Sequence, residues 1–275
     1  MTGILDKPEF PRSSGYDSDW ILGGNMGPNP LWLTEWLTTE MALEPGMRVL
    51  DLGCGMALSS VFLAREFDTR VMAADLWTSA HDNWRRVVAA GEAARVTPIQ
   101  AEAHALPFAE GYFDAVVSVD AYAYFGTDQL YLSYLSRFVR PGGLIGVVTP
   151  GLTQPLPNGE VPPHLTEPQA NGKVFWESDC VIFHTADWWR ELFRPCPHAE
   201  VVVADTLPDG WRHWLDHERA AEAAGKSPFP SDAEALEKDG GDYIGFVRVI
   251  AKRTASTAMN LYDSDLVAKV KAGLV

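Results

Sequence analysis

The sequence predicts an α/β fold, a mostly parallel sheet with helices on both of its faces. Between residues 47 and 149, short apolar runs alternate with segments that have helical spacing. Each run is apolar throughout instead of alternating with polar residues, and this is typical of strands that are buried on both faces of a parallel sheet. Strand–helix alternation of this kind indicates helices that pack over both faces of one sheet.

The predicted elements follow one another along the chain with recognisable ends. Asn29 begins the first helix, which has a proline in its first turn and ends at a Pro-Gly pair. Ser79 and Asp82 resemble a capping box, so a helix should begin there and run to Gly91. Strands are expected over residues 47–52, 70–74, 96–100, 113–119, 144–149, 200–204 and 243–252, and further helices over 57–67, 128–139, 186–193 and 209–224.

We interpret the chain as one domain with a decorated carboxyl half. The domain spans residues 29–255; an N-terminal segment over residues 1–28 precedes it, and a tail with a short helix over residues 256–275 follows it. Two insertions are expected within the domain, at residues 151–184 and 206–240. The first begins with a stretch that carries five prolines and little periodicity, and long loops of this kind are often lids or binding segments.

Composition and charge narrow the choice of partners. The formal net charge is −15, and no cluster of lysine and arginine gives the basic patch that is usual in nucleic-acid binding. No apolar run approaches the length of about 18 residues that a membrane-spanning helix needs. The three cysteines are scattered and form no C-x-x-C pair, which suits a reducing cytoplasm. We therefore expect a cytoplasmic protein with no nucleic-acid and no membrane partner, and a homo-oligomer stays open.

A glycine turn at the end of the first strand is the most informative feature of the sequence. The strand over residues 47–52 stops at Gly53-Cys54-Gly55, and a helix follows. Glycines at such a turn let a ligand approach the backbone, and ligands of open α/β sheets bind at the carboxyl ends of the strands. Asp75 follows Gly55 by twenty residues, at the end of the second strand. A carboxylate at that place can accept hydrogen bonds from both hydroxyls of a ribose.

A glycine turn followed by an acid is also the pattern of dinucleotide-binding proteins, so an NAD-dependent oxidoreductase is an alternative function at this point. Two residues speak against it. Leu58 stands where that pattern has a third glycine, and its side chain is too large for close contact between helix and strand. Asp51 would repel a pyrophosphate, whereas it could hold a cationic amino-acid end, directly or through water.

Four segments, taken in order, give a more specific pattern. They are VLDLGCGMA, VMAADLW, AEAHALPFAEGYFDAVVSVDA and LSRFVRPGGLIGVV. Over residues 47–149 the chain thereby resembles the class I S-adenosylmethionine-dependent methyltransferases, in particular small-molecule enzymes of the methyltransferase type 11 kind. The resemblance implies a Rossmann-like seven-stranded sheet of order 3-2-1-4-5-7-6, with the final strand antiparallel. It also implies S-adenosyl-L-methionine as cofactor, S-adenosyl-L-homocysteine as product, and methyl transfer to an oxygen or nitrogen atom of a small molecule.

The resemblance further implies roles for single residues around the cofactor. Residues 22–29 resemble a segment that closes over the cofactor in small-molecule members, which makes residues 1–28 a cover for the cofactor and the two insertions a cover for the substrate. Ala57 stands where the family often has glycine, a mild departure. The implied cofactor contacts are Asp51, Gly53 and Gly55 at the methionine end, Asp75 at the ribose, Leu76, Trp77, Glu102 and Ala103 around the adenine, Val119 and Asp120 facing the sulfonium, and Gly24 and Asn25 in the closing segment, with Tyr16 nearby.

The segment after the fourth strand narrows the reaction. Residues 118–125 resemble small-amine methyltransferases, in which an acid matching Asp120 contacts the amine and a histidine stands where this chain has Tyr124. They also match cyclopropane fatty acid synthases, but the Glu-His pair of those enzymes falls on Ala123 and Tyr124 here, which argues against cyclopropanation. His184 is a further candidate, because a histidine can take a proton from a hydroxyl or an amine. Asp120, Tyr124 and His184 are therefore the candidate catalytic residues, although a base is needed only where the nucleophile must lose a proton.

Aromatic residues of the carboxyl half are expected to form the substrate wall, with core packing as the alternative. Such a wall would suit an aromatic substrate or an amine, since aromatic faces attract cations. The residues concerned are Phe175, Trp176, Trp188, Trp189, Trp211 and Trp214. His213 and His217 have the i, i+4 spacing of metal ligands, but the sequence offers no third ligand, so we expect a solvated helix face and no metal. A cofactor-binding protein that does not methylate stays open as a second alternative function.

Overall fold

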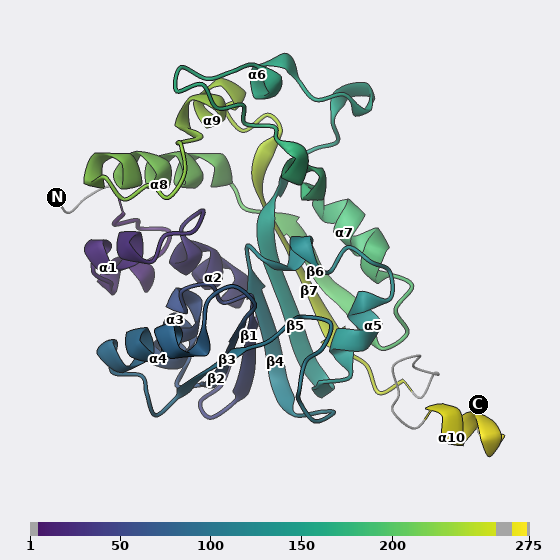
Figure 1. Cartoon of the computed structure of the whole chain (residues 1–275). Coiled ribbons are helices and arrows are strands. Elements are labelled where there is room, and N and C mark those ends of the chain that lie inside the picture. Colours follow the sequence, from purple (N-terminus) through teal and green to yellow (C-terminus); the bar gives the residue numbers. More distant parts are fainter. Residues whose placement is uncertain (1–4, 257–265, 274–275) are drawn as a thin grey trace.

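Seven strands form one sheet at the centre of the molecule (Figure 1). The computed structural model describes residues 5–256 and 266–273. Its strand order is β3-β2-β1-β4-β5-β7-β6, which confirms the predicted fold. Neighbouring strands pair in parallel, except that β7 runs antiparallel to both β5 and β6. The strands are β1 (Arg48–Leu52), β2 (Arg70–Asp75), β3 (Val96–Gln100), β4 (Phe113–Val119), β5 (Val139–Leu152), β6 (Ala199–Thr206) and β7 (Ile244–Arg253).

Helices lie on both sides of this sheet. Several begin at a capping side chain: Asn29 and Ser79, as the sequence predicts, and also Thr185 each accept a hydrogen bond from a backbone amide in the first turn. These bonds satisfy donors that a helix end leaves free. The α-helices are α1 (Ser18–Gly23), α2 (Pro30–Thr38), α3 (Leu58–Phe67), α4 (Ala80–Ala89), α5 (Tyr131–Ser136), α6 (Pro163–Thr166), α7 (Ala186–Phe193), α8 (Gly210–Ala224), α9 (Ala233–Asp239) and α10 (Leu266–Lys271).

Successive residues along each strand contribute to two cores, one on each face of the sheet. Val49 of β1 belongs to the core that contains α2 and α3, whereas the next residue, Leu50, belongs to the core that contains α5 and α7. In Figure 1, α2, α3 and α4 accordingly lie on one side of the sheet and α5 and α7 on the other. Because the strands are buried on both faces, the strand ends are where this sheet can present groups to a ligand.

Two predicted boundaries are wrong. Helix α2 ends at Thr38, well before the Pro-Gly pair that is predicted to end it. The helix expected over residues 128–139 is the shorter α5, and the Arg-Pro-Gly-Gly run that should end it lies inside β5. Val139 already pairs with Phe113, and the pairing of β5 with β4 continues beyond the glycines after an irregularity in register. The guanidinium of Arg140 donates to the carboxylate of Asp114 at 2.6 Å. Pairing with β4 thus overrides the local turn signal, as tertiary contacts often do.

The segments beside the regular strand–helix pattern gather near the carboxyl ends of the strands. In Figure 1, α6, α8 and α9 lie together there, and α1 lies below α8. No predicted element corresponds to α1, α6 or α9. Asp239 at the end of α9 holds α6, because its carboxylate pairs with the Nε2 atom of His164 at 2.9 Å. Helix α10 falls within the predicted tail, but residues 257–265 and 274–275 of that tail, and residues 1–4 of the N-terminal segment, lie outside the described residues.

Over the described ranges, no helix combines the length and the apolar character that crossing a membrane requires.

Candidate functional site

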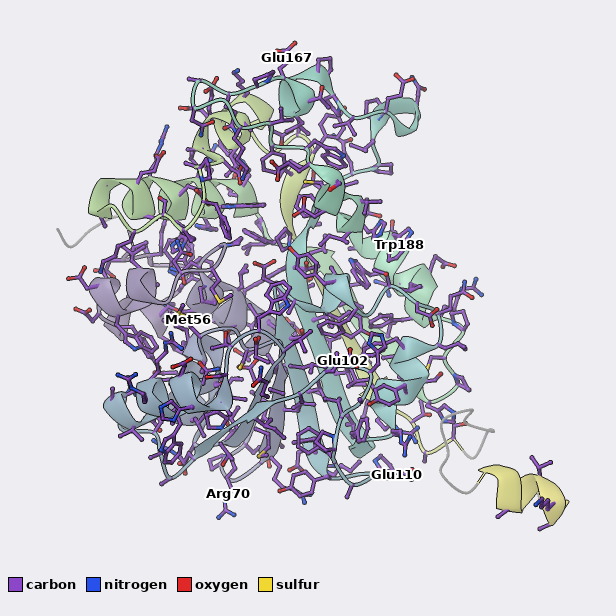
Figure 2. The ribbon with its side chains drawn as sticks, in the orientation of Figure 1. Met56, Arg70, Glu102, Glu110, Glu167 and Trp188 are labelled. Carbon is purple, nitrogen blue, oxygen red and sulfur yellow. The ribbon has the colours of Figure 1, made fainter. Side chains whose placement is uncertain are left out.

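A cavity of about 390 Å³ opens at the carboxyl ends of the strands. Volumes of roughly 300–1,000 Å³ are usual for sites that bind small molecules. We call the lining residues that follow β1, β2, β3 and β4 the floor, and we call Gly24, Met26, Gly27 and Pro28 of the N-terminal segment the roof. Figure 2 labels two residues of the lining, Met56 beyond the glycine turn and Glu102 after β3.

The turn after β1 needs glycine at two positions. Gly53 and Gly55 have φ values of 76° and 51°, in the left-handed region that L side chains rarely adopt. A Cβ on Gly53 would lie 2.3 Å from the Cβ of Ala121, and a Cβ on Gly55 would lie 3.0 Å from the Sδ of Met26. The backbone of this turn therefore faces the cavity without side chains. Ala57, which precedes α3, is also left-handed, with a φ of 61°.

Asp75 ends β2 beside the glycine turn and lines the cavity, and three backbone amides hold its carboxylate. Its Oδ2 accepts from the amide of Gly55 at 2.8 Å, and its Oδ1 accepts from the amides of Trp77 and Thr78 at 2.8 and 2.7 Å. A carboxylate has about four acceptor positions, so capacity remains for a hydroxyl group in the cavity. Leu76 and Trp77 also line the cavity and are largely exposed, so they offer apolar surface to a ligand.

Asp51 lies behind the floor and does not line the cavity. It is fully buried, and its Oδ2 accepts hydrogen bonds from the hydroxyls of Ser59 at 2.6 Å and Ser60 at 2.5 Å. Its Oδ1 has no hydrogen-bond partner within the described part of the chain. Burial raises the pKa of Asp51 to about 6, and the two serine hydrogen bonds oppose this rise. Ser59 does line the cavity, so a cation next to Ser59 would be close to an unpaired carboxylate oxygen.

The floor continues after β3 with Glu102, Ala103 and His104. The carboxylate of Glu102 accepts from the backbone amide of His104 at 2.8 Å, and it pairs with the Nδ1 atom of the same residue at 2.8 Å. The side-chain hydrogen bond from His104 lowers the pKa of Glu102. Glu102 therefore stays an anionic acceptor at the edge of the cavity.

Asp120 follows β4 and carries a carboxyl group to which the described residues make no hydrogen bond. Burial raises the pKa of Asp120 to about 7. The roof reaches this residue, because a Cβ on Gly27 would lie 2.7 Å from its Oδ2. Tyr124 and Phe125 line the cavity as well, and the pKa of Tyr124 is raised to about 12, mainly by burial. A carboxyl group that can exchange a proton near neutral pH thus lies in a partly aromatic part of the site.

Val119 and Gly24 line the cavity as the resemblance implies, but two other predicted residues do not reach it. The side-chain oxygen of Asn25 accepts hydrogen bonds from the backbone amide of Gly27 at 3.2 Å and from the Nε2 atom of His217 at 3.1 Å. The hydroxyl of Tyr16 donates to Glu66 at 2.9 Å. Both side chains therefore support the protein around the cavity, and their contact with a ligand remains a prediction.

His184 also lies outside the lining. Its ring stacks on that of Trp188, with ring centroids 3.5 Å apart, and burial lowers its pKa to about 4. Figure 2 shows Trp188 on α7, away from the labels of Met56 and Glu102. The His184 ring is therefore neutral and weakly basic. It could act as a base only if a proton travelled to it from a ligand in the cavity.

The predicted aromatic wall packs in the protein core or against it instead of lining the cavity. None of its six residues contributes to the cavity lining. Trp189 is fully buried in the core that contains α5 and α7. Trp214 stacks on Phe246 of β7 with centroids 5.3 Å apart, and Phe175 lies against Trp214. Helical spacing of large aromatic residues here reflects burial against the sheet, which is the alternative interpretation of the pattern.

The histidine pair of α8 is likewise buried, so the predicted solvated face is wrong. His213 lies against Phe10 and Trp32, and His217 also lies against Trp32. The residues that the structure describes contain no group of three or more His, Cys, Asp or Glu side chains that could hold a metal ion.

Several lining residues were not singled out by the sequence pattern. Met26, Gly27 and Pro28 line the cavity. They belong to residues 22–29, a segment in which the resemblance singles out only Gly24 and Asn25. Ser59 is a further one, and with Ser60 it forms a hydroxyl pair in the first turn of α3. A pair of hydroxyl residues directly after a glycine turn, with an acid at the end of the preceding strand, is a sequence signal that could have placed Ser59 in the site.

Comparisons with known proteins agree with this geometry. A family described as "Methyltransferase domain" matches residues 49–143. The demethylmenaquinone methyltransferase of Mycolicibacterium paratuberculosis is 35% identical over 109 residues, which are 40% of this chain and 44% of that protein. The match therefore spans less than half of that relative.

Two solved structures are similar over most of the chain. Phosphoethanolamine N-methyltransferase 2 of Haemonchus contortus, solved with S-adenosyl-L-methionine, has a TM-score of 0.65 at 18% identity and covers 91% of this chain and 59% of its own. Geranyl diphosphate C-methyltransferase of Streptomyces coelicolor A3(2), solved with Mg²⁺, geranyl diphosphate and S-adenosyl-L-homocysteine, has a TM-score of 0.59 at 19% identity and covers 80% and 78%. At these identities the likeness establishes the fold.

Proposed function

We propose that this chain, which matches a methyltransferase domain over residues 49–143, is a class I S-adenosylmethionine-dependent methyltransferase and transfers a methyl group from S-adenosyl-L-methionine to an oxygen or nitrogen atom of a small molecule. The product of the cofactor would be S-adenosyl-L-homocysteine. The observation that carries the proposal is the arrangement at one cavity. The glycine turn and the Asp75 carboxylate line it, and Asp51 lies behind the floor with one carboxylate oxygen that has no partner among the described residues.

The residues around the cavity suit this cofactor. The unpaired Oδ1 of Asp51, next to Ser59, matches a cationic amino-acid end. Asp75 has acceptor capacity for ribose hydroxyls, and Trp77 offers a large apolar surface for an adenine ring. Glu102 can accept a hydrogen bond at the adenine edge. When bound, the cofactor supplies a methyl group that its sulfonium activates.

The contribution of the chain to such a transfer is mainly positional. Holding a nucleophile and an electrophile in line can be worth roughly 7–11 kcal/mol. The turn at Gly53 and Gly55 brings backbone close to a ligand, and Gly27 of the roof comes within reach of Asp120. The floor and the roof thereby leave a defined space for both reactants.

The charge of the lining favours an amine as the acceptor. Three carboxylates line the cavity, namely Asp75, Glu102 and Asp120, and the described residues add no lysine or arginine to the lining. A phosphorylated or carboxylated substrate would find no cationic partner there, whereas an ammonium group could pair with Asp120. Tyr124 and Phe125 add aromatic surface, which favours a cation or an aromatic substrate further.

Asp120 is also the best placed group to take a proton. A general base works best when its pKa is close to the working pH, and burial raises the pKa of Asp120 to about 7. Tyr124 is protonated at that pH, because its pKa is raised to about 12, so it would donate a hydrogen bond. His184 is a weaker candidate, since it lies outside the lining and its pKa is lowered to about 4.

We further propose that residues 1–28 close over the cofactor, since Gly24 to Pro28 supply the roof. The insertions at residues 151–184 and 206–240 are proposed to cover the substrate end, although neither contributes to the lining. The NAD-dependent alternative is weakened by Leu58, which is buried and lies so close to the roof that a Cβ on Gly24 would be 2.2 Å from its Cδ1. A third glycine would leave that space open.

The test is calorimetric titration of the purified protein with S-adenosyl-L-homocysteine and, as a control, with NAD, after any co-purified ligand has been removed. Binding of the first in the micromolar range and no binding of the second supports the proposal. Binding of NAD alone overturns it. Turnover of labelled S-adenosyl-L-methionine on a panel of amines and alcohols then separates a methyltransferase from a protein that binds the cofactor without methylating.

A further inference from the structure

The roof of the cavity is fastened to a helix from the opposite end of the sequence. Asn25 lies in the roof segment, and its Oδ1 accepts one hydrogen bond from the amide of Gly27 at 3.2 Å and another from the Nε2 atom of His217 on α8 at 3.1 Å. One oxygen atom therefore fixes the local turn and ties that turn to α8. Because Gly27 lies so close to Asp120 that a Cβ on it would be 2.7 Å from the Oδ2 of Asp120, the tie leads from α8 to the substrate end of the cavity.

The surroundings of His217 suit a neutral ring that donates a hydrogen bond to the segment around Asn25. The ring is fully buried beside Trp32, and its Nδ1 has no hydrogen-bond partner within the described residues. Burial lowers the pKa of His217 to about 4, although the backbone of Gly27 opposes this shift. The ring is therefore neutral at ordinary pH, and its Nε2 carries the proton that it donates to Asn25.

Packing alone does not explain a histidine at this position. A buried polar group with an unsatisfied nitrogen is costly, and an apolar residue of similar size would fill the same space at least as well. His213 gives the contrast, because it is buried on the same helix against Phe10 and Trp32 but makes no hydrogen bond to the roof. An ion pair between Lys7 and Asp216 of α8, and another between Asp19 and Lys226 just beyond the end of α8, already hold the N-terminal segment in place.

We propose that His217 is a positioning residue for the ligand site: through Asn25 it holds the Met26–Pro28 turn over Asp120, so that retention of a bound ligand depends on α8. The inference rests on the proposed function only for the choice of S-adenosyl-L-homocysteine as a probe. Since α8 belongs to the insertion at residues 206–240, this insertion would hold the roof in place without contacting the ligand itself.

The experiment compares His217→Phe with His213→Phe. His217→Phe removes the donor and keeps an aromatic ring in the core, and His213→Phe makes the same change four residues away. Stopped-flow tryptophan fluorescence would measure the dissociation rate of S-adenosyl-L-homocysteine, and thermal unfolding without ligand would measure stability. We expect His217→Phe to raise the dissociation rate about five- to tenfold, the effect of one hydrogen bond, with the unfolding temperature lowered no more than in His213→Phe.

Two further variants separate positioning from packing. His217→Gln retains a side-chain N–H donor and should restore slow dissociation. Asn25→Ala also removes the hydrogen bond from the Gly27 amide, so its dissociation should be at least as fast as that of His217→Phe. The double variant should be no worse than Asn25→Ala alone, because His217 acts through Asn25. Equal dissociation rates for His217→Phe and His213→Phe would overturn the inference.

A second readout needs no ligand. Hydrogen exchange of the Gly27 amide, which Asn25 protects in the unliganded protein, should become faster in His217→Phe and stay unchanged in His213→Phe. If the wild-type protein failed to bind S-adenosyl-L-homocysteine, the proposed function would fail while this exchange result still decided the role of His217. Unchanged exchange in His217→Phe would contradict the positioning role directly.

Discussion

The floor and the roof of the cavity are built in different ways. The floor comes from the ends of neighbouring strands, and backbone conformation sets its shape. Gly53 and Gly55 are left-handed, and the carboxylate of Asp75 is held by amides of its own turn and of the turn after β1. The roof has a local hydrogen bond, from the amide of Gly27 to Asn25, but it also depends on a distant one. Its Asn25 is held by His217, a residue 192 positions later in the chain.

The floor is thus formed by contacts between neighbouring strand ends, whereas the roof depends on packing between distant parts of the chain. Contacts of the floor join residues that follow parallel strands, so the sheet itself brings them together. The contact between Asn25 and His217 exists only after α8 has packed on the N-terminal segment. We therefore expect changes in the floor to affect folding and ligand affinity together, whereas changes in the roof should affect ligand retention with little effect on stability.

The largest effect is expected at Asp120, where floor and roof meet. With an amine substrate, Asp120→Asn should lower the maximal rate by about 10²–10⁴-fold, the usual contribution of a general base. In the wild-type protein the rate should fall as the pH drops through about 7, because protonation removes the base. A pH–rate profile of both proteins checks this. An unchanged rate in the variant would mean that the enzyme works by positioning alone.

Stability gives Asp120 an independent check. Its folded pKa of about 7 lies above its ordinary value of 3.8, so the folded state disfavours the charged form. The contribution of Asp120 to stability should therefore decrease as the pH rises from about 4 to 7, by on the order of 3 kcal/mol. Asp120→Asn should remove this decrease. Chemical denaturation at pH 4.5 and pH 7.5 measures the difference, and parallel behaviour of the two proteins would argue against a buried, unpaired carboxyl group.

Gly53→Ala tests the floor. A side chain at this φ costs about 1–2 kcal/mol, and the contact with the Cβ of Ala121 adds roughly 1–3 kcal/mol of overpacking. We expect a loss of about 2–5 kcal/mol in the free energy of unfolding together with weaker cofactor binding. Gly23→Ala is the control beside the roof, because a Cβ there meets nothing within 4 Å; it should stay within about 0.5 kcal/mol of wild type. Equal losses in the two variants would remove the distinction.

Asp75→Ala probes affinity. A charge-assisted hydrogen bond to a ribose hydroxyl would be lost, so the dissociation constant for S-adenosyl-L-homocysteine should rise about tenfold or more. Asp75→Asn keeps one acceptor oxygen for the amides of Trp77 and Thr78, so it should preserve the turn better. Calorimetry on both variants gives the affinity, and circular dichroism gives the fold. A dissociation constant that did not change in Asp75→Ala would remove this residue from the site.

The same comparison explains how far prediction from the sequence reaches. Strand order, the glycine turn and Asp75 follow from short motifs, because local backbone geometry and parallel pairing fix them. The roles of Asn25 and His217 do not, since the hydrogen bond between them depends on the packing of distant segments. The aromatic residues of the carboxyl half show the same limit: helical spacing places Trp214 on one face of α8 but cannot say whether that face meets the core or a ligand.

Ala57→Gly should have the smallest effect, and it sharpens the contrast within the floor. Ala57 has a φ of 61°, so glycine would relieve about 1 kcal/mol of strain. The change would also remove a buried methyl group worth about 0.8 kcal/mol and give the unfolded chain more freedom. These terms oppose one another, and we expect stability to change by less than about 1 kcal/mol. A β-branched residue cannot adopt this conformation without strain, so Ala57→Val should be clearly destabilised. If denaturation ranked Ala57→Gly as the worse of the two, packing of this methyl group and not backbone conformation would control the turn.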